Sequence, residues 1–184
     1  MAMTLITNSA DTDSTDLANV SFTGIDSTYK LYIFKFIGIN AATDGAHFTF
    51  NGSDDTSSWS YDITKTTTSF MAYREESAGT GAGYGEFGYA APRDLAQSTA
   101  YKQIGVSLDD PADSGLAGTL WLFNPSNTTY VKHFYSTLQF MGNDSYAETR
   151  FSAGYFNATA AITALDFKCS SGNFDGTIKM YGVS

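Results

Sequence analysis

The chain of 184 residues carries 19 acidic and 10 basic side chains, which gives a formal net charge of −9. This charge argues against a nucleic-acid partner, because phosphate binding needs a basic face, and it favours solubility over non-specific association. Charged residues make up only 16% of the sequence and aromatic residues 15%, a balance that favours strands over helices in a single domain.

Cysteine content and targeting signals exclude several further kinds of protein. Cys169 is the only cysteine, so we expect neither an intrachain disulfide nor a cysteine-based metal site, and its strand pattern predicts a small core residue. The first 15 residues lack a basic region followed by a long apolar one, so no signal peptide is expected. No apolar run approaches the roughly 20 residues that a membrane-spanning helix needs, so no membrane partner is expected.

Residues 1–18 are predicted to form a flexible N-terminal arm. A short apolar stretch at 3–6 passes into the polar run NSADTDSTD. Asp11, Asp13 and Asp16 resemble the start of a calcium-binding loop, but the glycine and the closing glutamate of such a loop are missing. No metal site is therefore predicted there.

Residues 19–184 are predicted to form a single β-sandwich domain. Alternating or continuous apolar runs rich in β-branched and aromatic residues predict strands, and clusters of Gly, Asn, Asp and Ser predict the turns between them. The strand patterns lie at 19–22, 29–39, 46–50, 59–63, 66–73, 101–108, 118–124, 129–141 and 146–157, followed by a closing pair at 162–169 and 177–181.

These are eleven patterns, of which we expect about nine to ten to form strands, and a single helical turn is expected at 94–101. This predicts an all-β, antiparallel, jelly-roll-like β-sandwich. The patterns at 59–63 and 66–73 suggest one hairpin. The closing pair suggests another, because residues 170–176 between its strands tolerate positive φ or bond their own backbone.

The least regular region is a Gly-rich loop at 75–95, which holds five glycines together with Tyr84, Phe87 and Tyr89. A loop of this length inside a domain is either functional or disordered. It is not a phosphate-binding loop, because no Lys-Ser or Lys-Thr pair follows its glycines. Two alternatives stay open: a mobile excursion, or an interaction loop that orders against a neighbouring subunit as its aromatic side chains are buried.

No coherent catalytic set is found in the sequence. His47 and His133 show no ligand spacing to another His, Asp or Glu, and most acidic residues stand in turns, where they are expected without catalysis. A Gly-x-Ser-x-Gly nucleophile motif is missing. We therefore expect no enzymatic activity, no cofactor and no metal.

The aromatic surplus has a sugar-binding interpretation and a structural one. Trp59, Tyr84, Tyr89 and Trp121 are able to stack on sugar rings from a sandwich scaffold. Most aromatic side chains of such a fold fill its core, however, and Trp121 in the run TLWLF is expected to be buried.

Five segments of the chain are similar to segments of a known protein family. They are IDSTYKLY at 25–32, AHFTF at 46–50, DLAQST at 94–99, NATAAIT at 157–163 and SSGNFDGTIKMYG at 170–182. They resemble a family of virion structural proteins from marine tailed bacteriophages, of the cyanophage type. The resemblance spans residue 21 to the C-terminal end. Its motifs are fold motifs, and they carry no catalytic residue.

The resemblance implies a non-enzymatic virion protein, made in the host bacterial cytoplasm, that decorates or cements the capsid at the particle surface. Its implied partners are other copies of itself in a homotrimer, and the major capsid protein or another virion protein. The alternative is a head or tail fibre or receptor-binding domain with lectin-like binding to a host surface glycan. Trp59, Tyr84, Phe87 and Tyr89 are the candidate interaction residues.

Overall fold

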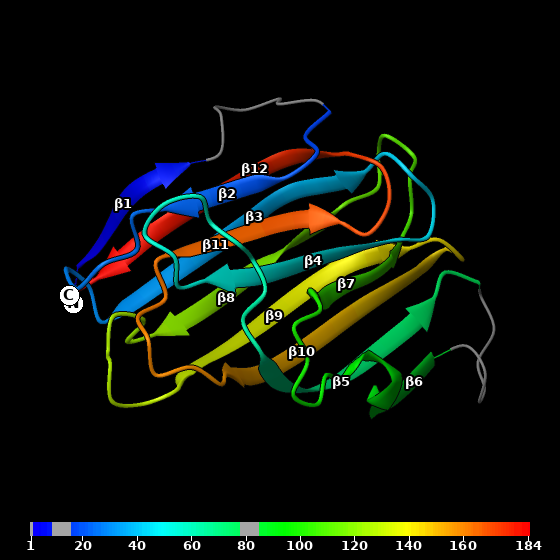
Figure 1. The fold of residues 1–184 in the computed structure, drawn as a ribbon. Coiled ribbons are helices and arrows are strands. Elements are labelled where there is room, and N and C mark those ends of the chain that lie inside the picture. Colours follow the sequence, from blue (N-terminus) through cyan, green and yellow to red (C-terminus); the bar gives the residue numbers. More distant parts are fainter. Residues whose placement is uncertain (1, 9–15, 78–84) are drawn as a thin grey trace.

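The computed structural model describes residues 2–8, 16–77 and 85–184, and nearly all of their regular structure is β-sheet (Figure 1). Within these residues no helix is long and apolar enough to cross a membrane. The one short 3-10 helix is η1 (Ala91–Arg93). The twelve strands are β1 (Met3–Asn8), β2 (Val20–Thr23), β3 (Leu31–Ala41), β4 (Ala46–Ser53), β5 (Lys65–Glu75), β6 (Gly85–Tyr89), β7 (Lys102–Leu108), β8 (Leu116–Phe123), β9 (Lys132–Gly142), β10 (Tyr146–Phe156), β11 (Ala164–Cys169) and β12 (Phe174–Val183).

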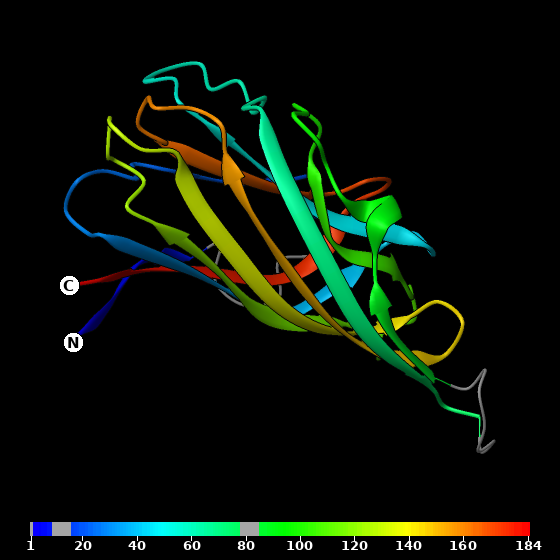
Figure 2. The ribbon, with the colours of Figure 1, turned by 90° about the horizontal axis from the view of Figure 1, so that it is seen from below.

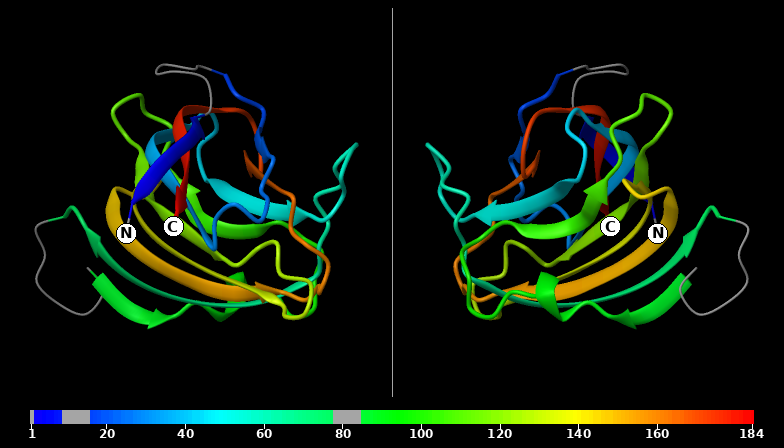
Figure 3. Two further views of the ribbon diagram at one scale, coloured as in Figure 1. Left: turned by 90° about the vertical axis from the view of Figure 1, so that its left-hand side faces the viewer. Right: turned by 90° about the vertical axis from the view of Figure 1, so that its right-hand side faces the viewer.

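All twelve strands belong to one antiparallel sheet that is strongly curled (Figure 3). One arm of the sheet runs β1-β12-β3-β8-β9-β10-β5-β6, and the other runs β7-β4-β11-β2. The arms meet where Leu108 of β7 pairs with Gly142 of β9, next to the backbone hydrogen bonds from Asp109 N to Met141 O and from Asn143 N to Ser107 O. An isolated bridge between Leu17 and Phe174 of β12 joins them again. The sheet turns at the contact of β7 with β9, and its arms face each other. This confirms the predicted all-β, antiparallel, sandwich-like fold, with twelve strands where about nine to ten were expected.

The predicted C-terminal hairpin is wrong. β11 and β12 do not pair with each other: β11 lies between β4 and β2, and β12 lies between β3 and β1. The intervening turn, in which Gly172 has a φ of 64°, therefore crosses from one arm to the other. Alternation along the two strands predicts which side chains are buried but does not say which neighbours supply the hydrogen bonds.

Three other predicted segments differ from the structure. Residues 59–63 form no strand, and β5 pairs with β10 and β6, so the predicted hairpin at 59–73 is wrong. Part of the expected N-terminal arm is a strand, because β1 pairs along β12; residues 9–15 lie outside the described part of the chain. The helical turn lies at Ala91–Arg93, before the expected 94–101.

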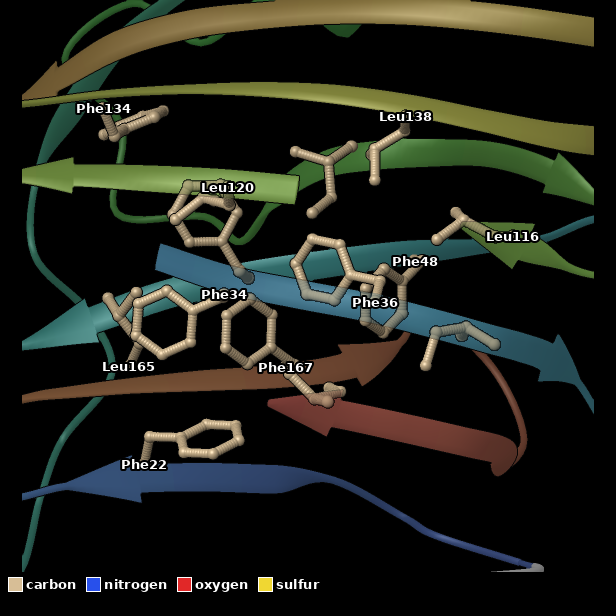
Figure 4. Packing of buried hydrophobic residues seen from close by; sticks show 14 of the residues in the cluster. Phe22, Phe34, Phe36, Phe48, Leu116, Leu120, Phe134, Leu138, Leu165 and Phe167 are labelled. Carbon is tan, nitrogen blue, oxygen red and sulfur yellow. The ribbon is translucent and has the colours of Figure 1, made fainter. Parts of the chain in front are cut away.

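The core between the arms is built around the ring of Phe167 on β11. Its centroid lies 5.3–6.2 Å from five other phenylalanine rings, and Figure 4 shows most of this cluster. The partners come from both arms and are Phe22, Phe34, Phe36, Phe48 and Phe50. Cys169, two residues along β11, is buried as predicted, and burial raises the pKa of its thiol to about 12.

Three lysines with no solvent exposure tie loops to the sheet. Lys65 Nζ donates to the carbonyls of Ile63 and Ala100 at 3.1 and 2.6 Å. Lys132 Nζ donates to the carbonyls of Ala158 and Thr159 at 3.1 and 2.8 Å. Burial lowers the pKa of Lys65 to about 7 and that of Lys102, the third lysine, to about 8.

Replacing Phe167 by Ala is expected to lower the free energy of unfolding by about 3–5 kcal/mol, because it opens a cavity where the two arms meet. Urea denaturation followed by tryptophan fluorescence measures the loss. Phe87→Ala, at a ring that is 74% exposed, is the control and is expected to cost less than about 1 kcal/mol. Similar losses for the two variants would contradict the central place of Phe167.

The buried lysine at position 65 is expected to make stability rise with pH between about 7 and 10. In this window the unfolded lysine, with a pKa near 10.4, holds a proton that the folded one has released, so raising the pH favours the folded state by up to about 1.4 kcal/mol per pH unit. The Lys65→Met variant loses the contribution of Lys65 to this slope and keeps that of Lys102. Urea denaturation at several pH values should show that the free energy of unfolding of the wild type increases relative to that of this variant as pH rises. A difference that stays constant with pH would contradict the assignment. The exposed Lys30→Met is the control and should keep the slope.

Candidate functional site

The outward side of β8, β9, β10 and β5 bears no Asp, Glu, Lys or Arg over its central rows. Side chains alternate along a strand, so every second residue of 117–123, 133–139, 149–155 and 66–72 points away from the core. These positions carry Ala, Thr, Gln, one His and aromatic residues. On a protein with a net charge of −9, an uncharged surface of this extent is a distinct feature.

Six rings stand out on this surface, and we call them the aromatic face: Phe70, Phe87, Trp121, Phe123, Tyr135 and Phe151. They form two groups of neighbours across the strands. Trp121 stacks on Tyr135 with centroids 4.4 Å apart, and Phe123 lies 5.8 Å from the same ring. Phe70 stacks on Phe151 at 4.8 Å and meets Phe87 at 6.0 Å.

The aromatic face is exposed in the isolated chain. All its rings except Trp121 are more than a third exposed, and shallow hollows lie between them, one lined by Thr68, Phe70, Tyr135 and Phe151. Cross-strand aromatic pairs contribute only about 0.5–1.5 kcal/mol each, which does not explain so much apolar surface in contact with water. Contiguous exposed apolar surface rimmed by polar residues indicates an interaction site.

The candidate interaction residues lie in three different settings. Phe87 belongs to the aromatic face, and Tyr89 pairs with Phe70 in register on the same strand pair. Tyr89 is 67% exposed and donates its hydroxyl hydrogen to Asp94 Oδ2 at 2.6 Å. Trp59 is 38% exposed in the segment between β4 and β5, and among the described ring contacts none joins it to the aromatic face. Tyr84 lies outside the described residues.

Sequence reasoning missed most of the aromatic face. The expected burial of Trp121 is wrong: it points outward on β8 and is half-buried beneath its stack with Tyr135. We expected most aromatic side chains of the fold to fill its core, whereas these rings lie on the outward side of the sheet. One signal in the sequence could have revealed this face. Over the central rows of β5, β8, β9 and β10 every second residue is uncharged, and these four strands are neighbours in the folded sheet.

The described part of the Gly-rich region consists of a strand and a following segment that is hydrogen-bonded to β5. Residues 85–89 form β6 on the edge of β5. After it, Ala90 N donates to Ser69 O and Thr67 N donates to Leu95 O, both at 2.9 Å. Lys102 Nζ donates to the Arg93 carbonyl at 2.7 Å, which fastens η1 over the inner side of the sheet (Figure 2). The described part of this region is therefore held to β5.

This segment walls a pocket of about 440 Å³ on the inner side of β5 and β10. Its floor consists of three neighbouring pairs in register, Met71 with Arg150, Tyr73 with Glu148, and Glu75 with Tyr146. Arg93 of η1, together with Val106 and Ser107 at the end of β7, forms the opposite wall. Tyr89, one of the candidate interaction residues, also lines this pocket. The sequence did not predict that the other lining residues come together, because they lie on strands that are neighbours only in the folded sheet.

A buried ion pair lies in the pocket floor. Arg150 Nε donates to Glu148 Oε1 at 2.7 Å, Arg150 Nη2 lies 2.5 Å from the same oxygen, and both residues are 4% exposed. Burial raises the pKa of Glu148, and the guanidinium of Arg150 opposes the shift. Nearby, burial and the charge of Arg93 lower the pKa of His47, whose Nδ1 accepts from Ser107 N at 2.9 Å.

Away from the pocket, one group of side chains in the described chain is of the kind that could hold a metal ion. Carboxylate oxygens of Asp44, Asp109 and Asp110 lie within 4.8 Å of one another in two turns. These groups are largely exposed, and exposed acidic clusters are common without an ion. His133 lies on the outward side of β9 and His47 beside Arg93, so the structure brings neither histidine into this cluster.

Comparison with known proteins adds no relative to these observations: no protein-family model matches the chain, and no curated protein matches it in sequence.

Proposed function

We propose that this chain is a non-enzymatic structural protein of a tailed-bacteriophage virion, a decoration or cement protein at the particle surface. The aromatic face is the observation that carries the proposal, and the resemblance of the five sequence segments supports it. A surface protein of this kind works by contact with its neighbours, so it needs a broad binding surface and no reactive centre.

The aromatic face suits contact between copies of an acidic chain. Two surfaces that both carry negative charge repel each other, and this repulsion weakens association. A face without Asp, Glu, Lys or Arg avoids that cost and needs no desolvation of charged groups. Burying its rings contributes about 25 cal/mol per Å² of apolar surface, which makes it the contact surface of the proposed homotrimer or with the major capsid protein.

The second candidate is a head or tail fibre or receptor-binding domain with lectin-like binding of a host surface glycan. The pocket under η1 favours it, because the pocket combines tyrosine rings with polar groups on rigid strands.

A virion role predicts that the protein is present in particles in many copies. Mass spectrometry of purified phage particles should detect its peptides at a ratio to the major capsid protein that stays constant through repeated banding. Cryo-electron microscopy of the same particles then places the domain on the capsid or at the tail. Absence of the peptides from particles would contradict the proposal.

Self-association through the aromatic face predicts that the triple variant Phe70→Ser, Phe87→Ser, Phe151→Ser is a monomer while the wild type forms trimers. Sedimentation velocity over a range of protein concentrations measures the change. The matched control is Tyr130→Ser, which removes a ring that is 69% exposed between β8 and β9. A variant that stays trimeric, or a wild type that stays monomeric, would contradict this contact.

A further inference from the structure

The pocket under η1 is a built site that an assembly role leaves unused. Six of its residues, in three cross-strand pairs, stand on the inner side of β5 and β10, so the sheet itself holds them in place. The volume of about 440 Å³ lies within the range of about 300–1,000 Å³ typical of small-molecule sites.

The pocket floor has unused hydrogen-bonding capacity. Arg150 Nη1 is buried and has no hydrogen-bond partner among the described residues, although buried polar groups are rarely left unpaired. Both contacts of Glu148 with Arg150 use Oε1, which leaves Oε2 available as an acceptor. Arg93 adds further donors. Its Nη1 donates to Gln103 Oε1 at 3.1 Å, and its other guanidinium nitrogens are not used in that bond. Arg93, Glu148 and Arg150 all line this pocket, so it combines hydrogen-bond donors with an acceptor.

The charges around this space select against ions. Three carboxylates, from Glu75, Asp144 and Glu148, line the pocket together with the guanidinium groups of Arg93 and Arg150. An anion meets the three carboxylates in a protein that is already acidic, and a cation meets two guanidinium groups with the ammonium of Lys102 behind them. A neutral ligand that both donates and accepts hydrogen bonds satisfies both kinds of group.

Two tyrosines add a surface for a ring. Tyr73 and Tyr146 lie on adjacent strands with their centroids 5.6 Å apart in an edge-to-face arrangement, and both line the pocket. Tyrosine combines an apolar ring with a polar tip, so it suits a ligand with one apolar face and a polar rim.

We propose that this pocket binds one sugar ring of a neutral glycan. Neighbouring hydroxyl groups accept from Arg93 and Arg150 and donate to Glu148, while the apolar face of the ring packs on Tyr73 and Tyr146. The inference specifies the site of the alternative function and uses no residue of the aromatic face, so it does not depend on the assembly contact.

Titration of the isotope-labelled full chain with methyl glycosides of glucose, galactose, mannose and N-acetylglucosamine tests the proposal by NMR. At least one glycoside should shift backbone amides within 71–75, 91–94 and 146–150, with a dissociation constant on the order of 1 mM. Glucuronate and methylammonium serve as charged probes and should bind at least tenfold more weakly. No shift in these amides with any glycoside, or tighter binding of a charged probe, would overturn the proposal.

Substitutions locate the binding in the pocket. Arg93→Met keeps the carbonyl that Lys102 uses and should weaken glycoside binding about tenfold, and Tyr73→Leu should do the same. Thr149→Val is the control: it lies between Glu148 and Arg150 on the opposite side of β10 and should bind like the wild type. Dispersed amide spectra verify that each variant is folded. Equal binding by Arg93→Met and the wild type would overturn the assignment.

The two proposals fail independently. A protein found in particles whose pocket takes none of the glycosides overturns the sugar site and leaves the virion role. Glycoside binding by a chain that is missing from particles overturns the virion role and leaves the sugar site.

Discussion

The packing of aromatic rings around Phe167 is the interaction on which the rest of the structure depends. Few backbone hydrogen bonds link the two arms of the described sheet, chiefly around Leu108 and Gly142, so side-chain packing between the arms holds them together. Phe167 supplies the contact because its ring meets rings from β2, β3 and β4. With the arms closed at one end of the curl, β5, β10 and β6 extend beyond the shared core, and the pocket floor and half of the aromatic face lie on this extension.

The aromatic face and the pocket lie on opposite sides of the sheet because side chains alternate along a strand. Along β10, Glu148 and Arg150 point inward to the pocket, and Thr149 and Phe151 point outward. The same alternation on β5 separates Tyr73 from Phe70. The proposed contact at the aromatic face and the proposed sugar site therefore use different surfaces of the same strands.

Buried lysines give this extension its rigidity. Lys102 joins Ser69 of β5 to the carbonyl of Arg93, and its ammonium lies 3.8 Å from Asp94 Oδ1. Lys65 and Lys132 likewise donate hydrogen bonds to backbone carbonyls, and they hold the loops at the other end of the strands. A long side chain that reaches several carbonyls holds a loop without needing another strand, which is useful where the sheet has only one layer.

Local patterns in the sequence determined the fold class, most strand positions and the burial of residues such as Cys169, because alternation and turn chemistry act over a few neighbouring residues. The tertiary structure alone decided the partners of each strand. It separated β11 from β12, turned Trp121 outward to stack on Tyr135, and placed Arg150 and Glu148 opposite Arg93. The aromatic face and the pocket both arise from side chains on neighbouring strands, and local patterns carry no information on strand order because hydrogen bonds between strands are made by the backbone, which is the same in every residue but proline.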